Sequence, residues 1–291
     1  MTHRRAAIRR ILLTLTAAAL AGCSRRAAGR PPATRLVPTL IPTGTASPDA
    51  SAPAAAPTTT LADSGWLAGP QGVELRRVRA PGSGQQPAVP MVVVRLDPAQ
   101  VRLRVAYDPQ NPQTLSAWFE QRRPLLAVNG SFFTQEYTST ALVISDGVAR
   151  GESYRGFGGM LAVTADERVE LWPLRDTPYD PSVPLAQGVQ SFPMLVFPGG
   201  APAALEDDGQ RARRTAVAID RAGRLLFVVS PTNGFTLPEL SAWLTGADLE
   251  VDRALNLDGG SSTGVYLSAG PLSERIDSFG PLPIVITAEA R

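Results

Sequence analysis

The amino-acid sequence predicts an α+β fold: a single domain, residues 66–291, with a strand-rich mixed-sheet core and few helices. Three observations support this prediction. Short apolar runs recur throughout the region, two pairs of runs have the spacing of hairpins, and only two segments have a clear helical period.

Ten apolar runs bounded by turn-forming residues are predicted to be strands. They comprise residues 88–96, 101–106, 125–128, 160–164, 169–172, 215–220, 225–230, 253–257, 265–267 and 282–287. Short polar segments at 165–168 and 220–223 separate neighbouring runs. We therefore expect two hairpins at these positions.

The first predicted helix lies between the second and third strands. Leu115, Trp118 and Phe119 follow the i, i+3, i+4 spacing of a helix face. Thr114 precedes them as a candidate N-cap, and Pro124 follows as a stop signal.

The second predicted helix covers residues 237–244 and has the same apolar spacing. Thr236 and Glu239 have the spacing of a capping box, in which each side chain bonds to the other residue's backbone. Gly246 is the expected C-cap.

The N-terminus resembles an export signal. A basic stretch, residues 1–10, precedes an apolar stretch, residues 11–20, that is too short to span a bilayer. Leu20-Ala-Gly-Cys23 resembles a bacterial lipobox, which predicts that residues 1–22 are a lipoprotein signal peptide and that Cys23 is lipidated. The expected location is exported and membrane-anchored, facing the periplasm or the cell exterior. The alternative is an ordinary signal peptide followed by an incidental cysteine.

Residues 23–65 are rich in proline, alanine and threonine and have few large apolar side chains. This composition predicts a disordered tether. The leader carries four arginines, so its removal changes the net charge from +2 to −2, and omitting the tether leaves −4. The basic character therefore belongs to the leader, and nucleic acid is not an expected partner.

The composition excludes several kinds of chemistry. The chain has no lysine, one histidine (His3) and one cysteine (Cys23), and both of these lie near the N-terminus. These absences exclude a P-loop lysine, a Ser-His-Asp triad, a histidine-ligated zinc and an intrachain disulfide. Carboxylates, arginines, amides, hydroxyls and backbone groups remain.

The segment 254–263 carries the strongest chemical signal. Asn256 and Asp258 alternate with leucines, two glycines follow, and then come three hydroxyl side chains. A tight hairpin explains the Asp-Gly pair but not the rest. A carboxylate beside glycine amides suits a site for a sugar and an anion.

The segment 211–220 places arginines before a strand and Asp220 at its end. A guanidinium is the preferred bidentate partner of phosphate. Arg214 abuts the strand and is the phosphate candidate. The alternative is an exposed basic run, favoured for Arg211 and Arg213, with Asp220 as a turn residue.

Two further segments are candidates. In Asn129-Gly130-Ser131-Phe-Phe, the aromatic pair either packs in the core or forms an apolar wall against a sugar. Residues 151–159 form a glycine-rich loop that holds Glu152, Tyr154 and Arg155. This loop lacks the spacing of a dinucleotide-binding fingerprint.

Three motifs in order resemble the phosphodiester glycosidase domain family, which includes the mannose-6-phosphate uncovering enzyme and many bacterial envelope proteins. They are Asn-Gly-x-Phe-Phe, Arg-Thr-Ala-Val-x-Ile-Asp and Asn-Leu-Asp-Gly-Gly-Ser-Ser-Thr, within roughly residues 125–267. Ser131 departs from the pattern, since the family usually has glycine there. The resemblance implies hydrolysis of a sugar 1-phosphodiester, such as a GlcNAc 1-phosphodiester, between the anomeric carbon and the phosphate oxygen.

The resemblance also implies a set of substrate-site positions. They are Asn129, Gly130, Arg214, Thr215, Asn256, Asp258, Gly259, Gly260, Ser261 and Ser262.

We hypothesise that Asp258 is the principal catalytic carboxylate, acting as nucleophile or base. Glu152 is the candidate second carboxylate, and Asp220 is a weaker rival. Asn129 and Asn256 would orient the sugar. No cofactor or metal is expected, although a divalent cation at Asp258 remains an open alternative.

Two other functions remain open. One is a non-catalytic envelope lipoprotein that binds a glycan or sugar phosphate. The other is a structural envelope protein that works through protein contacts.

Overall fold

The computed structural model describes residues 63–82 and 86–291. The predicted signal peptide, Cys23 and the predicted tether up to residue 62 lie outside the described residues. Asp63, at the end of the predicted tether, pairs with Val78 through an isolated β-bridge. Within the described ranges, no helix is long and apolar enough to cross a membrane.

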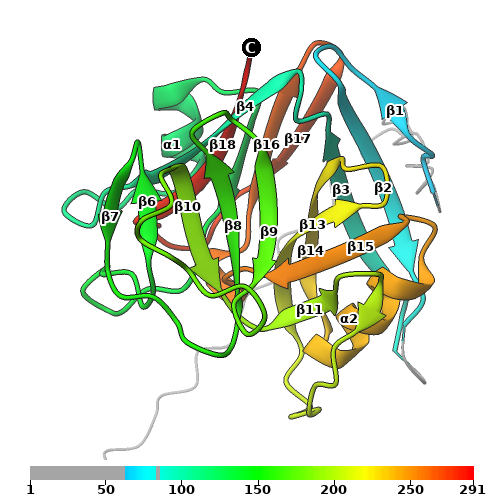
Figure 1. The fold of residues 1–291 in the computed structure, drawn as a ribbon. Helices are drawn as coiled ribbons and strands as arrows, with labels where there is room; N and C mark the ends of the chain where they lie inside the picture. The colour runs from blue at the N-terminus through cyan, green and yellow to red at the C-terminus, as the bar shows by residue number, and fades with distance from the viewer. Residues whose placement is uncertain (1–62, 83–85) are drawn as a thin grey trace, which may run out of the picture. The chain divides into compact units, whose positions relative to one another are not determined.

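Three antiparallel sheets make up the described domain (Figure 1). The first sheet has eight strands in the order β1 (Leu67–Ala68), β2 (Val73–Ala80), β3 (Val89–Leu96), β14 (Leu225–Phe235), β13 (Ala212–Asp220), β15 (Val251–Asn256), β11 (Met194–Phe197) and β12 (Ala201–Pro202).

The other two sheets have five strands each. The order in the second sheet is β7 (Val148–Arg150), β6 (Val143–Ser145), β10 (Leu185–Ser191), β8 (Gly159–Thr164) and β9 (Val169–Pro173). The order in the third sheet is β17 (Leu272–Ile276), β16 (Val265–Ala269), β5 (Leu126–Asn129), β18 (Ile284–Ala290) and β4 (Val101–Tyr107).

The strand-rich, helix-poor prediction is confirmed, and each of the ten predicted runs contains a strand. The prediction of a mixed sheet was wrong, because every strand pair in the described residues is antiparallel. Short hairpins account for pairs such as β8–β9 and β13–β14, whereas pairs such as β3–β14 and β4–β18 join segments far apart in the sequence. With two α-helices, the α+β label describes the chain only loosely.

All three sheets contribute side chains to one hydrophobic core. Val94 and Phe227 come from the first sheet, Leu161 from the second, and Val128 and Ile286 from the third. Each of these side chains is almost fully buried, which stabilises the fold by about 1.5–3 kcal/mol per large apolar side chain.

The two helices cover different sheets. α1 (Leu115–Arg122) contacts β5 and β16 of the third sheet. Its predicted N-cap is confirmed, because the hydroxyl of Thr114 accepts a 3.3 Å hydrogen bond from the backbone of Ala117.

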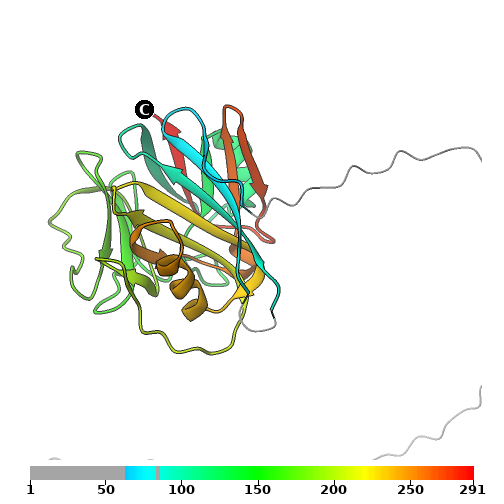
Figure 2. The ribbon, with the colours of Figure 1, turned by 90° about the vertical axis from the view of Figure 1, so that its right-hand side faces the viewer.

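α2 (Leu237–Gly246) lies against the first sheet, where Leu240 and Leu244 join a second apolar cluster (Figure 2). The predicted capping box of Thr236 and Glu239 is confirmed. The prediction of Gly246 as the C-cap was wrong, because Gly246 is the last helical residue and Ala247 is the C-cap.

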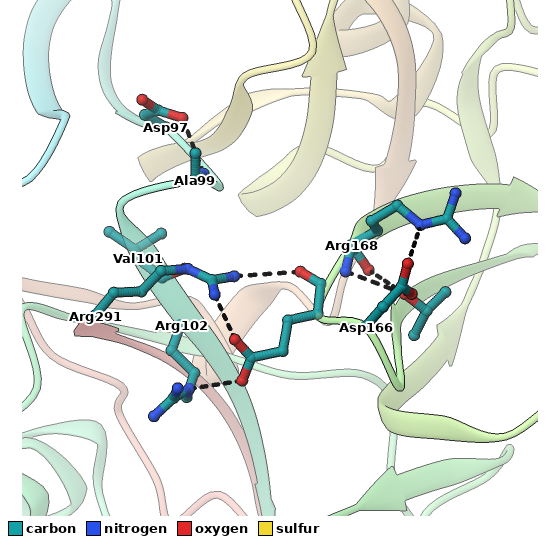
Figure 3. Close-up of polar contacts among 9 residues, drawn as sticks. Asp97, Ala99, Val101, Arg102, Asp166, Arg168 and Arg291 are labelled. Carbon is teal, nitrogen blue, oxygen red and sulfur yellow. Dashed lines mark hydrogen bonds and ion pairs between the residues drawn. The ribbon is translucent and has the colours of Figure 1, made fainter.

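An ion-pair cluster joins the second and third sheets. Glu167 lies in the β8–β9 turn and accepts from Arg102 Nε at 2.8 Å and from Arg291. Figure 3 shows both guanidinium groups directed at one carboxylate. Because these groups are partly exposed, the cluster contributes modestly to stability.

Candidate active site

The candidate site is built on the residues that follow β15. The β13–β15 register pairs Ala216 with Asn256, and the Leu257 amide continues it by donating to Thr215 O at 2.9 Å. Continuing this register by one more residue places Arg214 opposite Asp258. Directly opposed residues of antiparallel strands point to the same side of the sheet.

The glycine after Asp258 sustains this close approach. A Cβ at Gly259 would lie 2.8 Å from Arg213 O and 3.9 Å from Arg214 Cδ. Any side chain here would push the turn away from β13. Gly259 therefore lets the Asp258 turn lie against the Arg214 side chain.

The Asp258 carboxyl group is partly buried. Its Oδ1 accepts from the Gly259 amide at 2.8 Å, and its side chain also bonds to Ser262. Burial raises the pKa of Asp258 above its ordinary range, and the smaller effects of Ser262 and Gly259 oppose this shift. The Gly259 N–H is thus directed at Asp258 itself rather than at an external anion.

Arg214 is held by backbone carbonyl groups. Its Nε donates to Phe235 O at 3.1 Å, and its Nη2 donates to Gln210 O at 2.6 Å. Within the described part of the chain, no carboxylate lies within 4.0 Å of its guanidinium. Burial lowers the pKa of Arg214, but a guanidinium remains charged. Arg214 therefore has no direct ion pair among the described residues, although the charge of Asp208 acts on it and opposes the effect of burial on its pKa.

Asn129, at the end of β5, holds the turn from the other side. Its Nδ2 donates to Asp258 O at 2.8 Å, and its Oδ1 accepts from Thr215 Oγ1 at 2.8 Å and from Gly264 N at 3.1 Å. A longer bond to Gly130 O uses the second N–H. With both donors and both lone pairs engaged, Asn129 holds the site together rather than facing a sugar.

Asn256 differs from Asn129 in having a free acceptor. Its Nδ2 donates to Phe192 O at 2.9 Å, and its Oδ1 is buried with no partner among the described residues. A buried acceptor without a donor is costly. It is therefore a natural partner for a hydroxyl or amide N–H of a ligand.

The remaining candidates next to Asp258 have defined places. Gly130 is buried and its carbonyl accepts from the Asp258 amide at 3.1 Å. Thr215 and Ser262 are buried, whereas Ser261 is exposed. Gly260 has a φ of +59° and open space around its Cα. These residues shape the turn between β15 and β16.

The two other candidate carboxylates lie on a loop and at a strand end. Glu152 is exposed at the start of the 151–158 loop. Asp220 lies at the far end of β13, roughly 20 Å from Arg214 along an extended strand. It accepts from Arg224 Nε at 2.7 Å and from turn amides, which favours the turn-residue alternative.

Sequence reasoning missed the role of Arg213, which was expected in an exposed basic run. Arg213 is only 4% exposed, and its Nη2 donates to Thr263 O at 2.7 Å and to Asp277 O at 2.9 Å. Phe279 covers its guanidinium, with 3.9 Å between Cζ and the ring centroid. Alternation along β13 could have revealed this, because Arg213 has the inward parity of Thr215.

The adjacent side chains of Phe132 and Phe133 point in different directions. Phe132 turns toward Phe192, with ring centroids 4.7 Å apart, and Phe133 stacks on Tyr137 at 5.8 Å. Phe133 also packs against the core under α1. Ser131, between Gly130 and these rings, is buried with no partner for its hydroxyl in the described residues.

Comparison with known proteins places this arrangement in context. The phosphodiester glycosidase family model matches residues 123–282. A search of curated proteins gave no match. The zebrafish N-acetylglucosamine-1-phosphodiester alpha-N-acetylglucosaminidase catalytic domain, auto-inhibited by its pro-peptide, is similar in structure. Its TM-score is 0.60 at 19% identity, over 76% of this chain and 84% of that one.

A hypothetical protein from Synechocystis is also similar, with a TM-score of 0.55 and 16% identity, covering 76% of this chain and 62% of that one. At these identities the structures show the shared fold. The family match spans more than half of the sequence and contains all three motifs. The chain belongs to the phosphodiester glycosidase family.

Proposed function

We propose that this protein is a hydrolase that cleaves the bond between a sugar's anomeric carbon and the oxygen of a phosphodiester. The products are the free sugar and a phosphate monoester. The observation that carries this proposal is the opposed placement of Arg214 and Asp258, with neither residue in an ion pair among the described residues. Family membership and the zebrafish glycosidase support the substrate class.

Arg214 would bind the phosphate. Its backbone anchors fix the guanidinium before substrate arrives, so little reorganisation accompanies charge development. In a partly buried site this attraction is stronger than in water. Arg214 therefore stabilises the departing phosphate monoester.

Asp258 would act on the anomeric carbon. As a nucleophile it would form a glycosyl ester that water then hydrolyses, with retention of configuration. As a base it would take a proton from the attacking water, with inversion. Both routes need the ionised carboxylate, so activity should rise with pH through the raised pKa of Asp258.

The charge of the leaving group determines how much a second carboxylate is needed as a proton donor. A phosphate oxygen already carries negative charge, so it needs less protonation than an alkoxide would. Glu152, which is exposed on the 151–158 loop, is the candidate for protonating the leaving group or for activating water. A Glu152→Gln variant with the wild-type rate would remove it from the mechanism.

Asn256 would hold the reacting sugar. Its unpartnered Oδ1 can accept from a hydroxyl or from the N–H of an N-acetyl group. It lies two residues before Asp258, about 7 Å along an extended chain. This separation is close to the width of a pyranose ring.

Incubation of residues 63–291 with a GlcNAc 1-phosphodiester tests the proposal. Free GlcNAc and a phosphate monoester are the expected products, and their formation should be lost in Asp258→Asn. GlcNAc 1-phosphate as product would identify a different reaction class. Binding without turnover would favour the non-catalytic glycan-binding alternative.

We also propose that the protein is exported and anchored through lipidated Cys23, on the evidence of the Leu-Ala-Gly-Cys sequence. Expression of the full chain and of Cys23→Ala, followed by membrane fractionation, tests this proposal. The wild-type chain should partition with membranes and carry the mass of a lipid group. Equal partitioning of both forms would contradict lipid anchoring.

A further inference from the structure

A cluster of aromatic side chains lies beside the candidate site. Tyr154 is 4.6 Å from Phe157 and 5.7 Å from Phe192 between ring centroids, and Phe157 is 6.0 Å from Phe192. Phe132 packs beneath Phe192. We call Tyr154, Phe157 and Phe192 the aromatic platform.

The platform is exposed to an unusual degree for aromatic side chains. Phe157 is 50% exposed and Phe192 is 39% exposed. Isolated exposed apolar residues are common in proteins, but adjacent exposed rings indicate a binding surface.

Hydrogen bonds hold the Tyr154 end of the platform. Gln190 is fully buried and accepts from the Tyr154 amide at 2.8 Å, and it donates to Ser153 Oγ at 2.8 Å. The Tyr154 hydroxyl lies 2.9 Å from Thr140 Oγ1. A surface fixed in this way loses little conformational entropy when a ligand binds.

The platform adjoins the site on a defined side. Asn256 donates to the carbonyl of Phe192, and its own amide bonds to Pro193 O at 3.0 Å. Arg214 lies at the opposite end of the Asn256–Gly259 segment, against Gly259. The platform is therefore on the sugar side of Asp258, and Arg214 is on the phosphate side.

A cavity of about 560 Å³ borders the platform at Tyr154, the one platform residue that lines it. Tyr154, Arg155, Tyr179 and Ser153 are among its lining residues. Flat rings combined with hydroxyl and guanidinium groups suit a pyranose, which has an apolar C–H face and a rim of hydroxyl groups. An acyl chain would leave these polar groups without partners.

We propose that the aromatic platform binds a second sugar ring, linked to the sugar whose anomeric carbon reacts. The preferred substrate is then an oligosaccharide 1-phosphodiester rather than a monosaccharide one. This inference rests on the proposed function for the reacting bond. It adds Tyr154, Phe157 and Phe192 as residues that determine specificity.

The test compares two probes, GlcNAc 1-(methyl phosphate) and the corresponding chitobiose 1-(methyl phosphate). The wild-type kcat/KM should be about tenfold higher for the disaccharide, the scale expected of one stacking contact. Phe157→Ala should remove this advantage, mainly through KM, and Phe157→Trp should restore it. Val148→Ala, which truncates a side chain that is 52% exposed on β7, is the control and should behave as wild type.

Equal kcat/KM values for the two probes in the wild-type protein would overturn the proposal, as would equal losses for both probes in Phe157→Ala. If neither probe is hydrolysed, the proposed function fails, and calorimetric titration decides the platform separately. Disaccharide binding that is weakened in Phe157→Ala would still support it. Equal binding by both proteins, or no binding, would refute it.

Discussion

Continuing the β13–β15 register past Leu257 places Arg214 opposite Asp258. They do not form an ion pair in the described structure. Backbone carbonyl groups hold the Arg214 guanidinium, and the Asp258 carboxyl group bonds instead to Gly259 and Ser262. In the proposed mechanism, one substrate contacts both groups.

Replacing Arg214 should weaken catalysis strongly. Arg214→Ala should lower kcat/KM about 10²–10³-fold, the range for losing one preorganised charge stabiliser. Arg214→Lys should recover only part of it, because an ammonium cannot reproduce the two carbonyl bonds of the fork. Arg221→Ala, at an exposed position in the turn that follows the same strand, is the control. Similar rates for all variants in steady-state assays would argue against a phosphate role.

Ionisation of Asp258 should lower the free energy of unfolding. The pKa of Asp258 is higher in the folded than in the unfolded protein, where it is about 3.9. The stabilisation that the protonated Asp258 provides is therefore complete below the unfolded pKa and is lost as the pH rises through the folded pKa. Asp258→Asn removes this loss and should melt at a higher temperature than wild type at neutral pH. Thermal unfolding across the acidic range checks this. The difference in melting temperature between Asp258→Asn and wild type should become smaller toward low pH. A constant gap at every pH would contradict it.

The two glycines after Asp258 should respond differently to alanine. Gly259→Ala places a Cβ 2.8 Å from Arg213 O, so the turn must move and activity should largely disappear. Gly260→Ala meets no atom within 4 Å but has a φ of +59°, so it should cost about 1–2 kcal/mol of stability. Denaturant unfolding and kinetics on both variants separate the two effects. Equal activity in both would mean that close approach at Gly259 is unimportant.

Asn129 should matter for stability as well as activity. Asn129→Ala leaves buried groups of Thr215 and Gly264 without their acceptor and should lower the free energy of unfolding by about 1–3 kcal/mol. It should also lower kcat by loosening the Asp258 turn. Asn111→Ala, at an exposed position, should change neither quantity in urea unfolding or in kinetic assays. An Asn129→Ala protein as stable as wild type would contradict this role.

Much of the fold could be predicted because apolar runs in antiparallel sheets have a local signature. A strand rich in charged residues could not be predicted in this way, and β2 is the clearest case. Its Arg76 is buried and forms ion pairs with Asp63 and Asp248. Asp248 lies 172 positions away in the sequence. Such partners have no local signal in the sequence.

The site shows the same division. Asp258, Arg214 and Asn256 could be proposed from the sequence, because polar residues border or interrupt apolar strands there. The structural role of Asn129 and the burial of Arg213 depend on contacts between sheets. The aromatic platform also required structure, since Phe192 comes from a different segment than the glycine-rich loop.

Hydrolysis of a GlcNAc 1-phosphodiester in water enriched in oxygen-18 tests the central claim most directly. Attack at the anomeric carbon places the heavy oxygen on the sugar and leaves the phosphate monoester unlabelled, and this is the predicted result. The label should appear at that position with wild-type protein and be absent with Asp258→Asn. Label in the phosphate would show that the phosphorus–oxygen bond is cut, and it would contradict the assignment of Asp258 and Arg214.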